Sequence, residues 1–216
     1  MSGPTHYFTA EPEGDDRRRA RTVQLAGRTV QVQTAGGIFC PDRLDLGTSV
    51  LLRETPGPPP SGELLDLGCG WGPIALTMAM LAPLARVWAL DINRRALQLT
   101  GENARHLGLN GVHPVTAAQI PEDLSFDAIW SNPPIRVGKG ALHDLLLTWL
   151  PRLAPGGHAY LVVQRNLGAD SLHTWLASSL GPDFVASRLA SAKGFRVLHV
   201  QRGYPGELAL TRGEPT

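Results

Sequence analysis

Two hydrophobic patterns alternate along the chain from residue 61 onward. Short apolar runs predict buried strands at residues 64–67, 86–90, 112–117, 126–130, 157–163, 183–189 and 195–201. Apolar residues that recur every three or four positions predict helices at residues 73–82, 94–107, 141–153 and 170–179. Because strands and helices alternate, we expect an α/β fold with a doubly wound, mostly parallel, seven-stranded sheet.

The helix predicted at residues 141–153 has the clearest pattern. Its apolar residues form one stripe, which we interpret as core and not as a cofactor-binding surface. The stripe consists of Leu142, Leu145, Leu146, Trp149, Leu150 and Leu153. Pro155, Gly156 and Gly157 follow, and we expect them to end the helix and begin the next strand.

A β-hairpin is predicted before the main alternation begins. Val23 and Leu25 alternate with polar residues on one side of Ala26-Gly27. Val30 and Val32 do the same on the other side, so the two segments are expected to pair around a tight turn.

The remaining N-terminal residues predict little regular structure. Residues 1–20 lack periodicity, so we expect them to be extended or poorly ordered. A short helix is predicted at residues 49–53, and the prolines of residues 56–60 predict a stiff linker. We therefore expect an N-terminal extension, residues 1–60, and a main domain, residues 61–216.

Composition narrows the class of protein. The 216 residues carry a formal net charge of +1, with 43% apolar and 18% charged residues, unlike a strongly nucleic-acid-binding chain. No apolar run could cross a bilayer and no signal-peptide pattern is present, so we expect a cytoplasmic protein without membrane contact. Cys40 and Cys69 lie too far apart for a metal-binding pair, and the histidines lack ligand spacing. We therefore predict no metal site and two reduced, buried thiols.

Four arginines, Arg17, Arg18, Arg19 and Arg21, form a cluster near the N-terminus. The planar guanidinium binds phosphate groups well, so the cluster is a candidate contact for phosphate groups. A solvated N-terminal segment explains the same cluster, and both interpretations stay open.

The stretch at residues 64–76 predicts a ligand-binding bend, in which a buried strand leads through a glycine loop into a helix. Gly68, Gly70 and Gly72 let the backbone pass close to a bound molecule and expose N–H groups at the start of the helix. Asp66 supplies an acceptor beside them, so a ligand that carries both charges, such as an amino acid, suits the site. The alternative is a glycine-rich turn without a ligand.

Asp91 follows the second predicted strand, about 20 residues beyond the glycine loop. An acidic side chain at this position can accept both ribose hydroxyls of a nucleotide. The alternative is an N-cap for the helix that begins near Arg94, and Asn93 suits either role. The glycine loop and Asp91 together indicate a nucleoside-containing ligand.

A rigid corner is predicted where the fourth strand ends, at Ser131-Asn132-Pro133-Pro134-Ile135. Ligands of open α/β sheets bind at the carboxyl ends of strands, so this corner is expected to face the same crevice as the glycine loop. Two prolines remove two N–H donors, which leaves backbone carbonyls and the Asn132 amide oxygen as acceptors. A planar amino group is the natural partner of such acceptors, whereas a simple Pro-Pro turn is the alternative.

These motifs resemble those of a known family. The sequence from Asp66 to Gly72, followed by Asp91 and by Asn132-Pro133-Pro134-Ile135, resembles the class I S-adenosylmethionine-dependent methyltransferases of the Asn-Pro-Pro group, which have a Rossmann-like fold. Within that group the chain is similar to the small-subunit ribosomal RNA guanine 2-amino methyltransferases. Three further stretches resemble the same subfamily, at residues 6–8, 37–48 and 135–139.

The resemblance implies a set of cofactor-binding residues: Asp45, Gly47, Thr48, Asp66, Gly68, Cys69, Gly70, Asp91, Ile92, Asn93, Ala118, Gln119 and Asn132. Those near residues 45–48 and 66–70 would line the methionine part of S-adenosylmethionine. Asp91 would hold the ribose, while Asn93 and the loop at residues 117–119 would lie near the adenine.

The resemblance also implies a site for the acceptor. The catalytic set, Asn132, Pro133, Pro134 and Ile135, would hold the target amino group. Arg136 and Lys139, together with the N-terminal arginine cluster, would contact ribosomal RNA or the small ribosomal subunit. No general base is required, because the amine can lose its proton after methyl transfer. The oligomeric state expected is a monomer.

The chain departs from the family pattern in two places. Cys40 stands where a serine is common, and the tandem non-catalytic half of some relatives is absent. Ile135 replaces the aromatic residue usual in adenine and glutamine amino methyltransferases, which favours guanine as the acceptor. A protein glutamine, an adenine or a small amine stays open as an alternative acceptor.

Two other functional classes fit the motifs less well. A nicotinamide-dependent oxidoreductase would have the spacing Gly-x-Gly-x-x-Gly, whereas Pro73 occupies the third glycine position here. A catalytically silent RNA-binding module would not need Asp66, Asp91 and Asn132 together.

Overall fold

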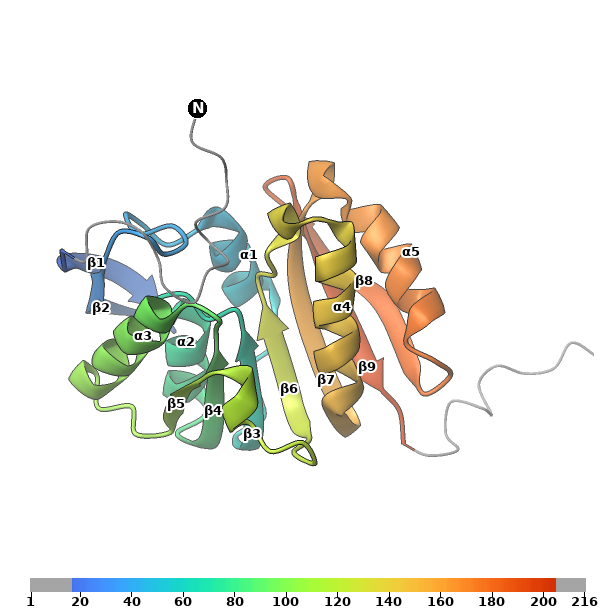
Figure 1. Cartoon of the computed structure of the whole chain (residues 1–216), viewed down its shortest axis with the longest axis horizontal. Coiled ribbons are helices and arrows are strands. Elements are labelled where there is room, and N and C mark those ends of the chain that lie inside the picture. Colours follow the sequence, from blue (N-terminus) through green and yellow to red (C-terminus); the bar gives the residue numbers. More distant parts are fainter. Residues whose placement is uncertain (1–16, 205–216) are drawn as a thin grey trace, which may run out of the picture.

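The apolar runs form a single seven-stranded sheet in the computed structural model, which describes residues 17–204 (Figure 1). Its strands are β3 (Ser61–Leu67), β4 (Leu84–Leu90), β5 (Val112–Val115), β6 (Phe126–Ser131), β7 (Leu153–Gln164), β8 (Phe184–Ala192) and β9 (Phe195–Arg202). Their order is β5-β4-β3-β6-β7-β9-β8. Only β9 runs antiparallel to its neighbours, β7 and β8. The predicted doubly wound, mostly parallel α/β fold is therefore confirmed.

Helices cover both faces of this sheet because each strand buries side chains on both sides. The helices are α1 (Leu46–Glu54), α2 (Pro73–Leu81), α3 (Arg94–His106), α4 (Lys139–Trp149) and α5 (Ala169–Ser179). The successive residues Leu64 and Leu65 are both fully buried, yet they belong to separate apolar clusters on opposite faces. Helices α1, α2 and α3 pack in one cluster, and α4 and α5 in the other. Within residues 17–204, no helix is both long enough and apolar enough to span a membrane.

The helix predicted at residues 141–153 is shorter than expected. Helix α4 ends at Trp149, the chain tightens into a 3₁₀ turn, η4 (Leu150–Arg152), and β7 begins at Leu153. Pro151 is the physical cause, because proline lacks the N–H that an α-helix interior needs. Leu150 and Leu153 are fully buried, so the prediction that they belong to the core is confirmed. The prediction that they belong to the helix is wrong.

The stop signal expected at residues 155–157 is also wrong, because these residues lie inside β7. The pairing of β7 with β6 shifts register between Phe126 and Ala128. A Cβ atom at Gly157 would lie 3.0 Å from the carbonyl oxygen of Phe126, so glycine permits the close backbone approach here. Proline and glycine thus mark an irregularity within the strand.

The strand predicted at residues 112–117 ends two residues earlier, at Val115. A 3₁₀ turn, η2 (Ala117–Gln119), follows it. The Gln119 side-chain oxygen accepts from the backbone N–H of Thr116 at 2.8 Å and from its hydroxyl at 2.9 Å. This local capping arrangement turns the chain away from the sheet.

The predicted hairpin consists of β1 (Arg19–Leu25) and β2 (Arg28–Thr34). Val23 pairs with Val30, and the two turn residues have positive φ, 48° at Ala26 and 74° at Gly27. These angles suit the two-residue turns that match strand twist. The expectations for residues 1–16, including the resemblance at residues 6–8, lie outside the described residues.

The short helix predicted at residues 49–53 is α1, which extends further in both directions. It begins after Asp45, whose side chain accepts from the backbone N–H of Thr48 at 3.0 Å. Buried residues of α1 and of the hairpin join the same apolar cluster as α2 and α3. The boundary at residue 60 stays a prediction.

A histidine pair lies on the sheet face that α1 covers. The Nδ1 atom of His158 on β7 is 2.9 Å from Nε2 of His199 on β9. The hydroxyl of Ser187 is 3.3 Å from the other nitrogen of His199, and the Tyr160 ring stacks on His199 with centroids 4.9 Å apart. Burial, followed by the nearby His158, lowers the pKa of His199.

The stability of the folded state is expected to decrease as the pH is lowered, because of His199. Between the lowered pKa of His199 and its ordinary value of 6.5, the unfolded chain binds more protons than the folded one. Acidification from about pH 7.5 to about 5.5 therefore favours unfolding. The variant His199→Phe keeps a ring against Tyr160 and removes the titration, so it loses less stability over this range. Thermal unfolding at both pH values measures the two slopes, and equal slopes would contradict this assignment.

Candidate active site

The glycine loop, residues 68–72, turns the chain from β3 into α2. Gly68, Gly70 and Gly72 have φ angles of 86°, 57° and 98°, which residues with a side chain rarely adopt. A Cβ atom at Gly68 or Gly70 would meet nothing within 4 Å, so these two glycines face open space. The loop is thus shaped for a molecule that approaches its backbone.

Asp66 lies at the end of β3, directly beneath this loop. Its side chain is fully buried, and one carboxylate oxygen accepts from the backbone N–H of Ala75 in the first turn of α2 at 2.9 Å. Asp66 therefore caps α2, whose N-cap residue is the glycine at position 72. The other carboxylate oxygen is buried without a hydrogen-bond partner. Burial raises the pKa of Asp66 well above its ordinary value of 3.8.

Two polar residues of α3, Thr100 and Asn103, support the glycine loop, and sequence reasoning missed both. The hydroxyl of Thr100 donates to the carbonyl of Gly70 at 3.0 Å, and a Cβ atom at Gly72 would lie 3.0 Å from this side chain. The Asn103 amide donates to the carbonyl of Trp71 at 3.0 Å. The sequence signal that could have revealed them is that two polar residues, three positions apart, lie on the apolar side of a predicted helix.

Asp91 lies at the end of β4, next to the glycine loop. One oxygen accepts from the N–H of Gly70 at 2.9 Å and the other from the N–H of Asn93 at 2.9 Å. The N-cap of α3 is Asn93 and not Asp91, because the Asn93 side-chain oxygen accepts from the N–H groups of Arg95 and Ala96. Burial raises the pKa of Asp91.

The Asn-Pro-Pro corner, residues 132–135, leaves the end of β6. The Asn132 side-chain nitrogen donates to the carboxylate of Asp45 at 2.8 Å and to the hydroxyl of Thr48 at 3.0 Å. Because both amide hydrogens are engaged, the orientation of the amide is fixed and its oxygen is left as an acceptor. The Pro133 carbonyl accepts from the N–H of Ile135 at 2.8 Å, which stiffens the corner further.

A small hollow, called the first hollow here, joins the loop and the corner. Asp66 pairs with Trp130 in the parallel register of β3 and β6, so Gly68 and Asn132 both lie two residues beyond a paired position. The predicted residues that line the hollow are Asp45, Thr48, Gly68, Cys69, Gly70 and Asn132, and those not predicted are Phe39, Trp71, Pro73 and Ile74, with Cys40. The expectation that loop and corner face one crevice is confirmed.

Several predicted cofactor residues do not line the first hollow. Asp66 and Asp91 support the loop from beneath, whereas Gly47 makes room for the Phe195 ring, which would lie 2.9 Å from a Cβ atom at that position. Ile92, Ala118 and Gln119 are exposed on the surface and also lie outside the lining of the hollow. The roles of these residues stay predictions.

The two cysteines differ in their surroundings. Both are free thiols, but Cys69 is buried and Cys40 is only half-buried, so the prediction of two buried thiols is wrong for Cys40. Burial raises the pKa of both, most strongly at Cys69. The described residues contain no cluster of three or more potential metal ligands.

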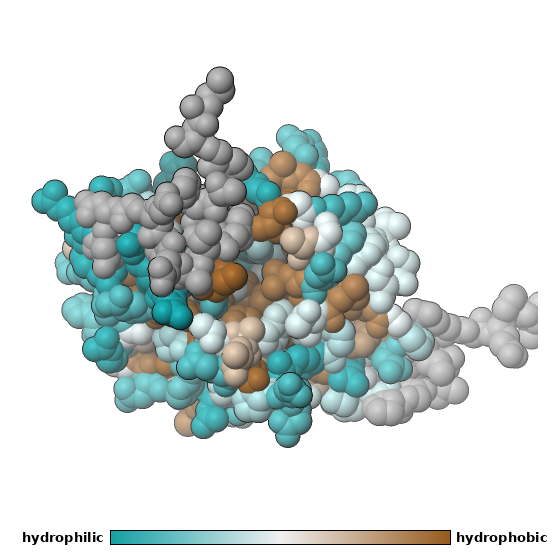
Figure 2. All heavy atoms as spheres, viewed as in Figure 1, coloured by the Kyte–Doolittle hydropathy of each residue, from teal (hydrophilic) through white to brown (hydrophobic). Residues whose placement is uncertain are grey.

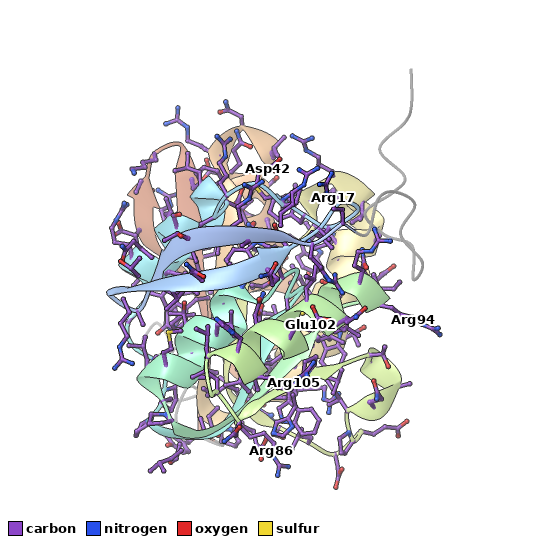
Figure 3. The ribbon with its side chains drawn as sticks, turned by 90° about the vertical axis from the view of Figure 1, so that its left-hand side faces the viewer. Arg17, Asp42, Arg86, Arg94, Glu102 and Arg105 are labelled. Atoms are coloured by element: carbon purple, nitrogen blue, oxygen red, sulfur yellow. The ribbon has the colours of Figure 1, made fainter. Side chains whose placement is uncertain are left out.

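The arginine cluster is engaged in ion pairs on the hairpin side of the molecule (Figure 3). Arg19 and Arg21 donate to Asp42, at 3.3 Å and 2.7 Å, and Arg18 donates to Glu102 of α3 at 3.2 Å. These pairs reduce the positive charge that the cluster offers to a phosphate. A contact between the cluster and RNA stays a prediction.

The fold and the site define a class I methyltransferase. A glycine loop after β3, an acid after β4 and an Asn-Pro-Pro corner after β6 lie at one sheet edge. The chain belongs to the methyltransferase small domain family, whose pattern matches residues 29–199.

Relatives from two bacteria are similar over most of the chain. The ribosomal RNA small subunit methyltransferase C of Ectopseudomonas mendocina (strain ymp) is 33% identical over 202 residues, covering 89% of this chain and 57% of that protein. The uncharacterized protein YbxB of Bacillus subtilis (strain 168) is 28% identical over 169 residues, covering 77% of this chain and 84% of that one. The chain thus spans little more than half the length of its relatives of the first kind.

Solved structures share the fold. A Thermus thermophilus 16S rRNA N2 G1207 methyltransferase, in complex with AdoMet and guanosine, superposes with a TM-score of 0.72 at 21% identity, covering 86% of this chain and 50% of that one. The T. thermophilus protein TrmN superposes with a TM-score of 0.55 at 28% identity, over 71% of this chain and 47% of that one.

The buried charge of Asp66 predicts a pH-dependent stability. Because its pKa is raised, the folded state binds more protons than the unfolded chain above pH 3.8, so Asp66 destabilises the fold increasingly as pH rises toward the raised pKa. The variant Asp66→Asn keeps an acceptor for Ala75 and removes the charge. Its free energy of unfolding is expected to improve relative to wild type from about pH 5 to about pH 8. Denaturant titrations of both proteins measure this difference, and a constant or shrinking difference contradicts the prediction.

Proposed function

We propose that the protein transfers the methyl group of S-adenosylmethionine to the 2-amino group of a guanine in small-subunit ribosomal RNA. One observation carries the proposal: Asn132, with its amide fixed by Asp45 and Thr48, shares a hollow with the open glycines Gly68 and Gly70. An acceptor for an amino group therefore lies beside a loop suited to a nucleoside-containing ligand.

The glycine loop and the acids around it fit S-adenosylmethionine. Gly68 and Gly70 leave open space above their backbone, and the buried carboxylate of Asp66 holds α2 beneath the loop through the N–H of Ala75. Asp91 holds the loop through Gly70 and keeps acceptor capacity for ribose hydroxyls. When bound, S-adenosylmethionine supplies an electrophilic methyl group.

The residues of the corner orient the acceptor nitrogen. The Asn132 oxygen accepts one hydrogen of the target amino group, and the Pro133 carbonyl keeps one lone pair for the second. Held by both acceptors, the amino group points its lone pair in one direction, and the nitrogen–methyl bond forms as the sulfur–methyl bond breaks. Such alignment can supply roughly 7–11 kcal/mol of the barrier. The amine then releases a proton to water, so no general base is assigned.

Guanine and ribosomal RNA are supported by two kinds of observation. Ile135 presents an aliphatic side chain directly after the two prolines, where an aromatic residue would favour adenine or glutamine as acceptor. The relative from Ectopseudomonas mendocina is named for small-subunit ribosomal RNA, and a structure that shares the fold contains guanosine. A monomeric protein of the cytoplasm is proposed together with this substrate.

Methyl transfer is expected to depend on Asn132. Tritium transfer from S-adenosylmethionine to purified small ribosomal subunits, followed by nucleoside mass analysis, should yield N2-methylguanosine. Asn132→Ala should lower the rate by about a hundredfold or more, because the amino group loses its alignment, while the calorimetric Kd for S-adenosylmethionine changes little. Asn110→Ala, an exposed asparagine between α3 and β5, is the matched control. Methylated adenine, protein glutamine or a small amine as the sole product would contradict guanine as the acceptor.

Asp91 is expected to determine the affinity for S-adenosylmethionine. Asp91→Ala removes the acceptor proposed for the ribose and releases the N–H of Gly70, so Kd should rise roughly tenfold or more. Asp127→Ala is a matched control, because Asp127 also accepts a backbone N–H, that of Glu63, at the opposite end of the sheet. Calorimetric titration measures both variants. An unchanged Kd in Asp91→Ala would remove Asp91 from the ribose site.

A further inference from the structure

The Asn-Pro-Pro corner borders a second hollow, with a volume of about 140 Å³. It lies between the beginnings of α4 and α5 and is called the second hollow here. Its walls include Ile135, Lys139, Leu142, Val163, Leu167 and Leu172. Asn132, Pro133 and Pro134 are not among its lining residues, whereas Ile135 is. The second hollow is therefore distinct from the acceptor group at Asn132 but begins at the far end of the same corner.

The walls of the second hollow are mainly apolar. Val163 and Leu172 form buried parts of the wall, while Leu167 on the 3₁₀ turn η5 (Arg165–Leu167) is 42% exposed. Figure 2 shows apolar residues gathered around this part of the surface. An open, apolar recess favours a flat ring, which can bury one face against the wall and keep the other face in contact with water.

Exposed cations lie on the segments that form the second hollow, and one of them, Lys139, lines it. Arg136 lies on the 3₁₀ turn η3 (Ile135–Val137), Lys139 begins α4, and Arg165 begins η5. None of these three side chains forms a hydrogen bond or ion pair with the described residues. By contrast, Arg196 on β9 is held by Asp170. The cations at the rim are thus available to a phosphate backbone.

One member of an aromatic pair, His143, lines the second hollow on the α4 side. The ring of His143 stacks on Trp175 of α5 with centroids 3.6 Å apart and an angle of 10° between the rings. Burial, followed by the nearby Lys139, lowers the pKa of His143, whose ring lines the hollow.

We propose that the second hollow binds the nucleobase next to the target guanine in the same RNA strand. This inference rests on the proposed function, which places the target amino group at Asn132. The target ring then extends along the corner toward Ile135, and the next base of the strand reaches the recess beyond it. The phosphates that link the two nucleotides lie near Arg136 and Lys139. The hollow thereby adds affinity for a strand over a single nucleoside.

Two serines of α5 allow a matched test. Ser171 lines the second hollow, and Ser178 lies two helical turns further on, outside it. Both are exposed, and each donates to a carbonyl three residues earlier, Gly168 or Trp175, at 2.9 Å and 3.0 Å. Ser171→Trp fills the hollow, and Ser178→Trp makes the same change elsewhere on the same helix.

The experiment measures binding of three hexanucleotide RNAs in the presence of S-adenosylhomocysteine. Each has one central guanosine; one has bases on both sides, and the others have an abasic residue on the 5′ or the 3′ side. On wild type, one abasic RNA should bind about tenfold more weakly than the intact RNA. Ser171→Trp should weaken the intact RNA by a similar factor and abolish the abasic difference. Ser178→Trp should behave as wild type.

Several outcomes would overturn the proposal. These are equal binding of all three RNAs to wild type, equal behaviour of the two tryptophan variants, and no binding of any of the RNAs. If Ser171→Trp weakens free guanosine as strongly as the hexanucleotide, the hollow holds the target base and not its neighbour. Methyl transfer is measured in the same samples. A clear abasic effect without methylated guanine would reject the proposed acceptor and leave the base-binding hollow supported.

Discussion

The parallel register between β3 and β6 is the constraint on which the site depends. Asp66 pairs with Trp130, so the backbone leaves both strands at the same level of the sheet. The glycine loop and the Asn-Pro-Pro corner follow from these two strand ends and meet in the first hollow. A shift of one residue would turn the apolar side chains of β6 to the wrong faces, so the core itself enforces the alignment of the site.

Buried polar groups then hold the loop in a shape that the apolar core alone could not define. Thr100 and Asn103 satisfy carbonyls of the glycine loop, and Asn103 also bonds both backbone groups of Gln33 on the hairpin. A buried carbonyl left without a donor costs about 1–3 kcal/mol, so these contacts strongly favour one loop conformation. Asp66 is the exception, because one of its oxygens has no partner. This residual cost lies at the place where a charged ligand is proposed.

The sequence predicted those features that depend on local chemistry. Glycines at alternate positions predicted positive φ angles, and Asn132 followed by two prolines predicted a rigid corner at a strand end. The placement of both in one crevice followed from the general rule for parallel sheets.

Features that depend on tertiary contacts were missed or wrong. Asn103 looks like an ordinary helix residue until the hairpin and the loop are seen on either side of it. In the sequence, Arg19 and Arg21 look like unpaired positive charges, because their partner Asp42 lies about 20 residues away in a separate loop. The predicted end of α4 was wrong for a local reason. The apolar periodicity continues to residue 153, whereas Pro151 ends the α-helix before that point.

The carboxylate of Asp45 has two tasks, since it caps α1 and also anchors the Asn132 amide. Asp45 precedes the first strand of the central sheet, yet it fixes a side chain that follows β6. Without this anchor the amide could rotate by half a turn and present its NH₂ group in place of its oxygen. The N-terminal segment thus determines which polar group of Asn132 faces the first hollow.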